Sequence, residues 1–365
     1  MISCVNVVGA RPNFMKIAPL LLAMQASGRF VTSLVHTGQH YDASMSDVFF
    51  GDLGIPEPDV TLDIGSGTHA EQTARTMLGL EPVLLDVSPD LVVVVGDVNS
   101  TLAGALTAAK MGIPVAHVEA GLRSRDWSMP EEINRVVTDV LSDYLFAPSE
   151  DAVQNLRMEG IPPERIHLVG NIMIDSLQAH LDRARASHIL KDLGLKPNSY
   201  FVATLHRPSN VDDPGTLERV VEILAEVARL RPEVLVAHPR TTCRLAATDG
   251  LQRLAESGVR VIEPLGYLDF LRLLADATAV LTDSGGIQEE TTVLGVPCIT
   301  LRDRTERPIT VSLGTNLVAG LDAEAVLSAA RAAITDRIRP ARPPLWDGHT
   351  ADRIVDILVE HLDRS

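Results

Sequence analysis

The segment from Leu281 to Glu290 (LTDSGGIQEE) has the residue types and spacing best suited to binding an anion. An apolar, β-prone run ends at Leu281, a Ser-Gly-Gly turn follows, and a helix-compatible run then begins. A helix start of this kind offers free backbone N–H groups and partial positive charge to phosphate oxygens, and its glycines let phosphate approach the main chain. Glu289 and Glu290 follow within about one turn, where a carboxylate could hold a ribose hydroxyl pair. The alternative is a helix capped by Ser284 whose glutamates only complement the helix dipole.

Acidic residues follow two other apolar runs and a proline that can start a helix. Asp97 stands just after the run 91–95, and Glu119 closes the run that begins at Val115. A carboxylate at the end of an apolar run is costly to bury unless it is paired, so we expect Glu119 to have a functional role. Glu131 and Arg135 have the i,i+4 spacing that places both on one helix face. A turn-forming Asp97 and a surface salt bridge between Glu131 and Arg135 are the structural alternatives.

Basic residues and histidines follow further apolar runs. Arg11 and Lys16 come just after Gly9, near the start of an expected helix, where two cations could neutralise a pyrophosphate. The alternative is solvated charge on a surface helix, and for Lys16 taken alone this is the favoured interpretation. His206 and His238 each follow a β-prone run almost directly, and this repeated placement predicts that they line a binding cleft.

These polar residues must be positioned by the alternation of short apolar runs and helical patterns along the chain. Such alternation is typical of parallel strands with helices on both faces. Ligands of open sheets bind beyond the carboxyl ends of the strands, which is where the polar motifs fall. The expected strands are 3–8, 31–36, 91–95, 115–119, 144–147, 200–204, 234–237, 259–262, 279–281 and 297–301. The expected helices are 13–26, 42–50, 70–87, 100–111, 216–230, 268–275 and 287–294.

Chain length predicts more than one domain. A chain of 365 residues exceeds the size at which a single hydrophobic core stops growing. We predict an N-terminal domain at 1–172, a C-terminal domain at 173–345, and a last helix within 346–365 that packs on the N-terminal domain. Two α/β domains facing each other would form a cleft lined by their βα loops.

Composition narrows the classes of partner. Lysine and arginine total 32 against 48 acidic residues, and the net charge of −16 should repel nucleic acid and anionic membranes. No apolar run is long enough to span a bilayer, and no signal peptide is apparent, so we expect a cytoplasmic protein. The three cysteines, Cys4, Cys243 and Cys298, are far apart, and we predict buried, reduced thiols. The sequence contains no metal-ligand cluster and no full G-x-G-x-x-G, so neither a metal nor a nicotinamide cofactor is expected.

An ordered set of motifs resembles the non-hydrolysing UDP-N-acetylglucosamine 2-epimerases. The resemblance runs from about Val5 to Val318 and implies an α/β fold of GT-B type, with two Rossmann-like domains whose parallel sheets face each other across a deep cleft. It also implies a homodimer that acts on a UDP-sugar without a metal or nicotinamide. The motifs are Gly9-Ala-Arg-Pro, Thr37-Gly-Gln-His, Gly96-Asp, His117-Val-Glu-Ala-Gly-Leu-Arg, Pro130-Glu-Glu-Ile-Asn-Arg, His206-Arg, Asp283-Ser-Gly-Gly-Ile-Gln-Glu-Glu and Arg302-Asp-Arg-Thr-Glu-Arg-Pro.

The reaction of that family gives a physical reason for these residue types. Inversion at C2 of the sugar without a redox cofactor requires loss of the C2 proton and its return on the opposite face. Departure of UDP from C1 acidifies the C2 hydrogen, so the family route is elimination to a 2-acetamidoglycal followed by re-addition. The leaving pyrophosphate needs preorganised donors, and the ring needs proton-transfer groups on both faces.

The resemblance assigns roles to individual residues. Asp97 and Glu131 are expected to be the proton-transfer pair, Glu119 to orient the sugar, and His206 to stabilise the leaving UDP. The expected UDP-sugar-binding residues are Arg11, Lys16, Gln39, Arg135, Ser284, Gly285, Gly286 and Glu290.

The sequence also departs from the family pattern. Asn13 stands where many members have Glu, and Pro208-Ser209 replaces Arg-Glu. Bacterial members often bind a second UDP-N-acetylglucosamine at an allosteric site through a Gln and an Arg. Here Asp42 takes the first position and the segment 66–73 contains no arginine, so we predict weak or absent substrate activation.

Three other functions are compatible with the fold that the resemblance implies. A hydrolysing 2-epimerase would release UDP and free N-acetylmannosamine because water would trap the glycal. A UDP-sugar-binding module would bind without catalysis, although Asp97, Glu119, Glu131 and His206 argue against it. A GT-B glycosyltransferase would share the nucleotide-binding half, but the Glu119 and Glu131 motifs weigh against this.

Overall fold

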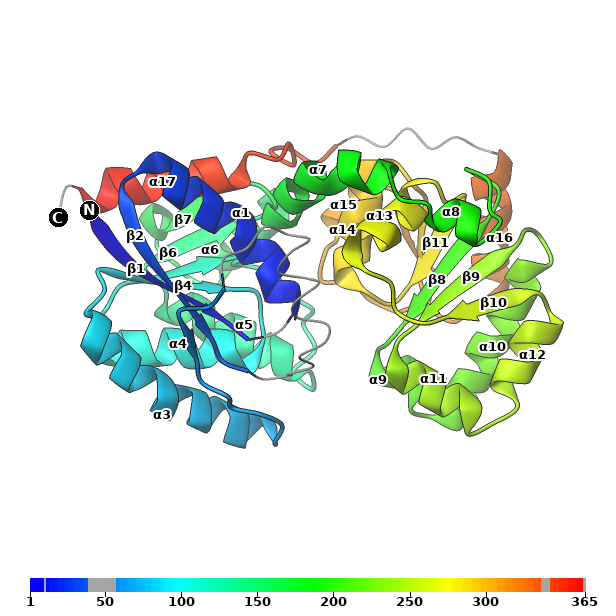
Figure 1. Cartoon of the computed structure of the whole chain (residues 1–365), viewed down its shortest axis with the longest axis horizontal. Helices are drawn as coiled ribbons and strands as arrows, with labels where there is room; N and C mark the ends of the chain where they lie inside the picture. Colours follow the sequence, from blue (N-terminus) through cyan, green and yellow to red (C-terminus); the bar gives the residue numbers. More distant parts are fainter. Residues whose placement is uncertain (10, 39–56, 336–341, 364–365) are drawn as a thin grey trace. The chain divides into compact units, whose positions relative to one another are not determined.

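The structure, a computed structural model, describes residues 1–9, 11–38, 57–335 and 342–363 (Figure 1). It separates into two compact units, Met1–Ala179 with Pro344–Ser365, and His180–Pro343. Within the described residues, each unit contains one sheet whose paired strands are all parallel. The α/β class with two parallel sheets, which the sequence predicts, is confirmed.

The sheet of the first unit has the strand order β3-β2-β1-β4-β5-β6-β7 in the described part of the chain. The strand order reverses between β1 and β4, so the carboxyl ends of these two strands meet at a switch point, where ligands of open α/β sheets bind. The strands are β1 (Ile2–Val8), β2 (Phe30–His36), β3 (Val60–Thr61), β4 (Leu91–Val95), β5 (Val115–Val118), β6 (Tyr144–Ala147) and β7 (Ile166–Leu168).

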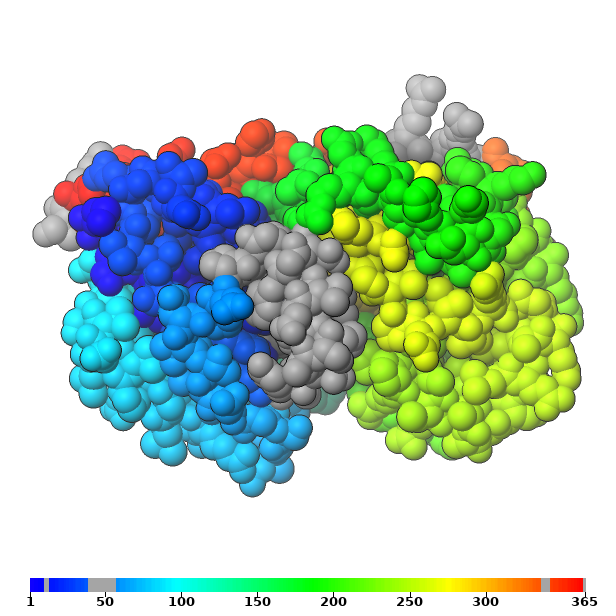
Figure 2. Space-filling view, viewed as in Figure 1, coloured from blue at the N-terminus to red at the C-terminus, as the bar shows by residue number. Residues whose placement is uncertain are grey.

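Helices cover both faces of this sheet. Figure 1 shows α3, α4 and α5 on one face and α1 with α17 on the other. The light-blue surface in Figure 2 belongs to α3, which forms the outer layer on this side, whereas α4 packs against α3 and is largely buried. The C-terminal segment packs on this unit, because the indole N–H of Trp346 donates to the Pro148 carbonyl at 2.9 Å. The helices are α1 (Arg11–Ser27), α3 (His69–Val87), α4 (Asn99–Lys110), α5 (Pro130–Leu141), α6 (Glu150–Met158), α7 (Ile172–Arg185) and α17 (Thr350–Leu362), with a 3-10 turn at Pro163–Arg165.

Helix α5 distributes its polar and apolar side chains in the opposite way to most surface helices. Its buried face carries polar and charged side chains, whereas its exposed face carries an apolar stripe with the i, i+4, i+7 spacing of one helix face. The buried polar residues are Glu132, Asn134, Arg135, Thr138 and Asp139. The exposed apolar residues are Ile133, Val137 and Val140.

The second unit repeats the plan with the strand order β10-β9-β8-β11-β12-β13 among its described residues. Here the order reverses between β8 and β11, so the carboxyl ends of these two strands meet. The strands are β8 (Phe201–Leu205), β9 (Glu233–Ala237), β10 (Val259–Ile262), β11 (Ala279–Thr282), β12 (Cys298–Thr300) and β13 (Asn316–Val318). The helices are α8 (Ile189–Asp192), α9 (Pro208–Val211), α10 (Pro214–Ala228), α11 (Pro239–Ala246), α12 (Gly250–Glu256), α13 (Tyr267–Ala275), α14 (Gly285–Leu294), α15 (Ile309–Ser312) and α16 (Ala323–Thr335).

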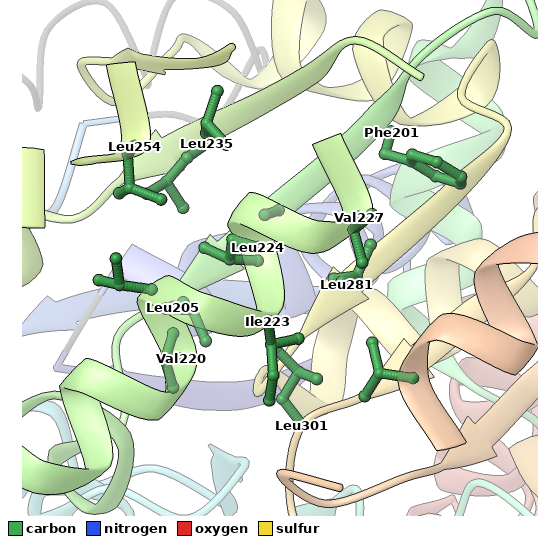
Figure 3. Packing of buried hydrophobic residues seen from close by; sticks show 14 of the residues in the cluster. Phe201, Leu205, Val220, Ile223, Leu224, Val227, Leu235, Leu254, Leu281 and Leu301 are labelled. Carbon is green, nitrogen blue, oxygen red and sulfur yellow. The ribbon is translucent and has the colours of Figure 1, made fainter. Parts of the chain in front are cut away.

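The core of the second unit forms where α10 packs on its sheet (Figure 3). Val220, Leu224 and Val227 of α10 recur at helical spacing and are buried together with Leu205 and Leu281 of the strands. This packing fixes the strands whose carboxyl ends carry the polar loops.

Some sequence predictions need correction. The short strands β3, β7 and β13 were not predicted, because two or three residues give too short an alternation to recognise. The expected helix at 42–50 lies outside the described residues. The prediction of a buried thiol is wrong for Cys243, which is exposed because α11 buries Thr241 and Leu245 on its other side. No helix in the described part of the chain is long and apolar enough to cross a membrane.

Candidate functional site

A buried ion pair joins β5 to α1 at the switch point of the first unit. Lys16 of α1 donates to Oε2 of Glu119, and both side chains are almost fully buried. The alternative interpretation of Lys16 as a solvated surface charge is therefore wrong. The other oxygen of Glu119, Oε1, is buried and has no hydrogen-bond partner among the described residues. The φ of Glu119 is 73°, a left-handed conformation that side chains adopt rarely and that recurs at functional sites.

Gly96 makes room for this pair. Its φ is 71°, and a Cβ atom there would lie 2.9 Å from Lys16 Nζ and 3.3 Å from Asn13 Nδ2. Only glycine fits this position. Asn13 accepts from the Gly9 N–H at 3.3 Å and donates to the Val95 carbonyl at 2.9 Å, so it links the turn after β1 to the end of β4.

Asp97 is paired with Arg135 of α5. Its Oδ2 lies 2.5 Å from Arg135 Nη1, and Arg135 is buried. Arg135 also donates to Glu132 Oε2 through Nη2 at 2.7 Å and through Nε at 3.0 Å. The predicted alternative of a surface salt bridge between Glu131 and Arg135 is wrong. Arg135 faces inward and binds the carboxylates of Asp97 and Glu132.

Glu132 was missed by the sequence reasoning. It accepts from the backbone N–H groups of Ser124 at 2.9 Å and Arg125 at 2.8 Å, so it fixes the loop before α5. Burial would raise the pKa of Glu132, but the Ser124 N–H and the Arg135 guanidinium outweigh burial and hold this pKa below its usual value. Its i,i+3 spacing to Arg135 was the available signal.

Glu131 differs from its neighbour. It is half-buried in the first turn of α5, and no described residue donates a hydrogen bond to its carboxylate. The same turn is held to Asp97, because Asn134 Nδ2 donates to the Asp97 carbonyl at 2.9 Å. Glu131 is therefore an acid available to a ligand beside a fixed acid–cation pair.

In the second unit, Asp283 organises the loop after β8. It is fully buried at the end of β11, lies 2.8 Å from His206 Nδ1, and accepts from the Arg207 N–H at 2.9 Å and from Asn210 Nδ2 at 3.1 Å. Burial would raise the pKa of Asp283, but His206 and the backbone N–H groups outweigh burial and lower it. The His206 ring stays 42% exposed, so it can reach a ligand while Asp283 holds it.

His238 has a structural role at the start of α11. Its Nδ1 accepts from the Arg240 N–H at 3.2 Å and so caps the helix. Burial and the neighbouring charge of His206 lower the pKa of His238. The two histidines therefore lie near each other, at the ends of neighbouring strands.

At the N-terminus of α14, an arginine side chain fills the space beside Gly285, and the space beside Gly286 is unoccupied by described residues. A Cβ atom on Gly285 would lie 2.4 Å from Arg307 Nη1, whereas a Cβ atom on Gly286 would meet no atom of the described residues within 4 Å. The Ser284 side chain makes no capping hydrogen bond, so the alternative of a Ser-capped helix is wrong. Gly285 accommodates an arginine, and Gly286 leaves the helix end accessible to an anion.

Arginines surround a buried carboxylate beside this helix end. Glu306 Oε1 lies 3.1 Å from Arg307 Nη1 and 3.3 Å from Arg207 Nη2, and Glu306 Oε2 lies 2.9 Å from Arg302 Nη1. Burial opposes ionisation of Glu306, but Arg307, Arg302 and Arg207 lower its pKa to about 2. These guanidinium groups are thus preorganised, and they add positive charge where anionic ligands bind well.

Glu290 lies on the buried side of α14. Burial raises the pKa of Glu290 to about 7, with Glu289 adding to the shift, although the Tyr267 hydroxyl opposes it by donating to Glu290 Oε1 at 3.2 Å. Tyr267, which the sequence reasoning missed, packs edge-on against His180 with ring centroids 5.8 Å apart.

The structure thus gathers most predicted site residues at strand ends. Lys16, Asp97, Glu119, Glu131 and Arg135 lie together in the first unit. In the second unit, His206 follows the end of β8, Ser284, Gly285 and Gly286 follow the end of β11, and Glu290 lies further along α14. The side chain of Arg11, together with Gln39 and Asp42, lies outside the described part of the chain. No group of three or more His, Cys, Asp or Glu residues that could hold a metal occurs among the described residues.

Comparison with known proteins decides the family. A family model described as UDP-N-acetylglucosamine 2-epimerase matches residues 22–359. The chain belongs to this family. The resemblance that the motifs indicated is confirmed.

Individual 2-epimerases match over nearly the whole chain. The UDP-N-acetylglucosamine 2-epimerase of Methanocaldococcus jannaschii is 43% identical over 97% of this chain and 98% of its own. The UDP-2,3-diacetamido-2,3-dideoxy-D-glucuronate 2-epimerase of Pseudomonas aeruginosa is 42% identical over 97% of this chain and 99% of its own. The crystal structure of the M. jannaschii enzyme in complex with UDP-GlcNAc and UDP has a TM-score of 0.91 at 42% identity, covering 98% of this chain and 100% of that one. This match confirms the fold class of the 2-epimerase family for this chain.

Proposed function

We propose that this member of the family interconverts UDP-N-acetylglucosamine and UDP-N-acetylmannosamine without net hydrolysis. The observation that carries the proposal is the set of acids at the ends of β4 and β5, where Asp97 is paired with Arg135 and Glu119 with Lys16. This set occurs in a chain that matches the family over residues 22–359. Acids held by cations at strand ends are suited to proton transfer at a sugar carbon.

The first step of the proposed reaction breaks the bond from C1 to the UDP oxygen, and the bonding electrons leave with UDP. The open helix end at Gly286 supports this step by offering N–H groups to the diphosphate. The guanidinium groups around Glu306 and the exposed ring of His206 supply further stabilisation of the leaving charge. Glu290, which accepts a hydrogen bond from Tyr267, is the proposed ribose-binding residue.

The second step removes the C2 proton, and the C–H electron pair forms the C1=C2 bond of a 2-acetamidoglycal. Re-addition returns UDP to C1 while a proton reaches C2 from the opposite face. Asp97 and Glu131 are the proposed acid and base, and Glu119, whose Oε1 has no partner in the described residues, orients the sugar. The Glu131 carboxylate is accessible, and the Arg135 guanidinium holds the Asp97 carboxylate in place.

We also propose that the protein acts as a homodimer. The exposed stripe on α5 supports this, since Ile133, Val137 and Val140 are 42%, 36% and 57% exposed on a helix whose polar face is already buried. A contiguous apolar stripe of this kind marks an interaction surface.

A second candidate substrate follows from the comparisons. The P. aeruginosa relative, named for UDP-2,3-diacetamido-2,3-dideoxy-D-glucuronate, is as similar to this chain as the M. jannaschii enzyme is. That sugar would undergo the same C2 inversion, because the leaving group and the acidified C–H bond are equivalent.

The decisive experiment incubates pure protein with each UDP-sugar in deuterated water and follows the products by NMR. We expect UDP-N-acetylmannosamine carrying deuterium at C2. Free N-acetylmannosamine with UDP would instead identify a hydrolysing enzyme. Faster conversion of the diacetamido-glucuronate would select the second substrate, and binding without any product would reduce the chain to a binding module.

A further inference from the structure

His117 belongs to a motif that the proposed reaction leaves without a role. It lies in β5 with a fully buried ring. Its Nδ1 lies 2.6 Å from Asp139 Oδ1 of α5, and its Nε2 lies 2.8 Å from the Gly96 carbonyl oxygen. The ring therefore bridges the turn after β4 and a helix that is distant in sequence.

The chemistry of the two partners sets the protonation of this ring. A carbonyl oxygen only accepts hydrogen bonds, and so does an ionised carboxylate. Both nitrogens of His117 must therefore donate, which makes the ring an imidazolium. Asp139 is held in its ionised form, because its second carboxylate oxygen accepts from the Gly121 N–H and from the Arg123 guanidinium.

Asp139 extends the bridge to the turn after β5. Its Oδ2 accepts from the Gly121 N–H at 3.0 Å and from Arg123 Nη2 at 2.7 Å. Gly121 is two residues beyond Glu119, and Gly96 directly precedes Asp97. The two turns that carry these acids are thus tied to one carboxylate.

The same helix face holds Asp97 from the other side. Asp139 follows Arg135 by four residues, so both project from one face of α5, and Arg135 binds Asp97 at 2.5 Å. The group His117–Asp139–Arg135 therefore links α5 to Asp97 both through the backbone of Gly96 and through the Asp97 side chain.

We propose that His117, as a buried imidazolium paired with Asp139, is a positioning residue for the acids Asp97 and Glu119. This inference rests on the proposed function. Without the imidazolium, the Gly96 peptide loses a charge-assisted hydrogen bond, and Asp97 loses one of the contacts that fix its position, while those from Arg135 and Asn134 remain. A misplacement of about 1 Å at a reacting group can lower a rate about 10²-fold.

Kinetics of His117→Gln test the role. We expect kcat to fall by about 10- to 100-fold, while the Kd for UDP stays within about twofold, because the proposed diphosphate groups lie in the second unit. Asp139→Asn, which keeps the side-chain shape, should reproduce the loss and provides the measurement if His117→Gln does not fold. In the double variant the two losses should not add, since both break the same bridge.

Asp175→Asn is the matched control. Asp175 is a buried carboxylate of the same unit that accepts from the Ala351 N–H at 2.8 Å and so holds α17. It should lower the unfolding free energy while kcat stays near the wild-type value. Unchanged kcat in folded His117→Gln or Asp139→Asn, or an equal kcat loss in Asp175→Asn, would overturn the positioning role.

Nitrogen-15 NMR of histidine-labelled wild-type protein gives a readout that does not depend on activity. We expect one imidazole with slowly exchanging protons on both nitrogens, absent from His117→Gln and altered in Asp139→Asn. A ring with a single proton would overturn the inference. If wild-type protein makes no epimer, the proposed function fails while this signal persists, so the two failures can be told apart.

Discussion

Glu131 and Glu150 allow a matched comparison of two acids, because each lies in the first turn of a helix, α5 or α6. Only Glu131 stands on the helix that binds Asp97. We expect Glu131→Gln to lose at least about two decades of kcat, the usual scale of general acid–base catalysis, and to keep UDP binding. Glu150→Gln should leave both unchanged. Steady-state kinetics and calorimetry with UDP measure the two effects, and near-normal turnover of Glu131→Gln would remove this residue from the mechanism.

Glu233, at the start of β9, is an acid buried without a use in the proposed reaction. Neither carboxylate oxygen has a hydrogen-bond partner among the described residues, and burial raises the pKa of Glu233 well above its usual value. Folding therefore favours the protonated acid. This contribution to stability is complete below the unfolded pKa of about 4.3 and is lost as pH rises through the raised folded pKa.

Glu233→Gln should remove this pH dependence, because the amide cannot ionise. At pH 8 the variant should have a larger unfolding free energy than the wild type, by on the order of 1 kcal/mol or more. Near pH 4 the difference in unfolding free energy between the variant and the wild type should vanish. Urea denaturation at both pH values measures this difference. A value that does not change with pH would contradict the raised pKa of Glu233.

At the scale of elements, the N-terminus of α14 gives a paired prediction. Gly286→Ala places a methyl group where no atom of the described residues lies within 4 Å, so it should not lower stability but should block phosphate and weaken UDP binding at least about tenfold. Gly285→Ala drives a methyl group into Arg307, so it should lower the unfolding free energy as well as UDP affinity. Thermal unfolding and calorimetry separate the two, and unweakened UDP binding by Gly286→Ala would exclude this helix end as the phosphate site.

Helix α5 shows what sequence periodicity can and cannot predict. The i,i+4 rule correctly places Glu131 and Arg135 on one face of neighbouring turns, but it does not predict whether that face is buried or exposed to solvent. Because the buried side of α5 is polar, the usual rule that apolar residues face the core fails here. Glu132 and Asp139 were therefore overlooked, although they hold Arg135 and His117.

At the scale of the whole chain, the positions of the loops were predictable and their pairings were not. Alternating strands and helices put the polar turns at the carboxyl ends of parallel strands, and the structure confirms two parallel sheets. The pair of Lys16 and Glu119, however, joins residues 103 positions apart. No local pattern encodes such a contact, because it depends on how α1 packs against the end of β5.

Dimer formation is the prediction that belongs to the whole molecule. The described residues of its own unit leave the stripe of α5 exposed, because the opposite face of the helix is the one that packs inward. A second copy that presents the same stripe would bury both stripes at once, as two-fold interfaces do.

Val137→Glu would put an unpaired charge into that contact, and such a charge is costly to bury. We therefore expect light scattering to show a dimer for the wild type and a monomer for the variant. Met158→Glu, at an exposed position on α6, is the control and should remain dimeric. A dimeric Val137→Glu protein would show that another surface makes the contact.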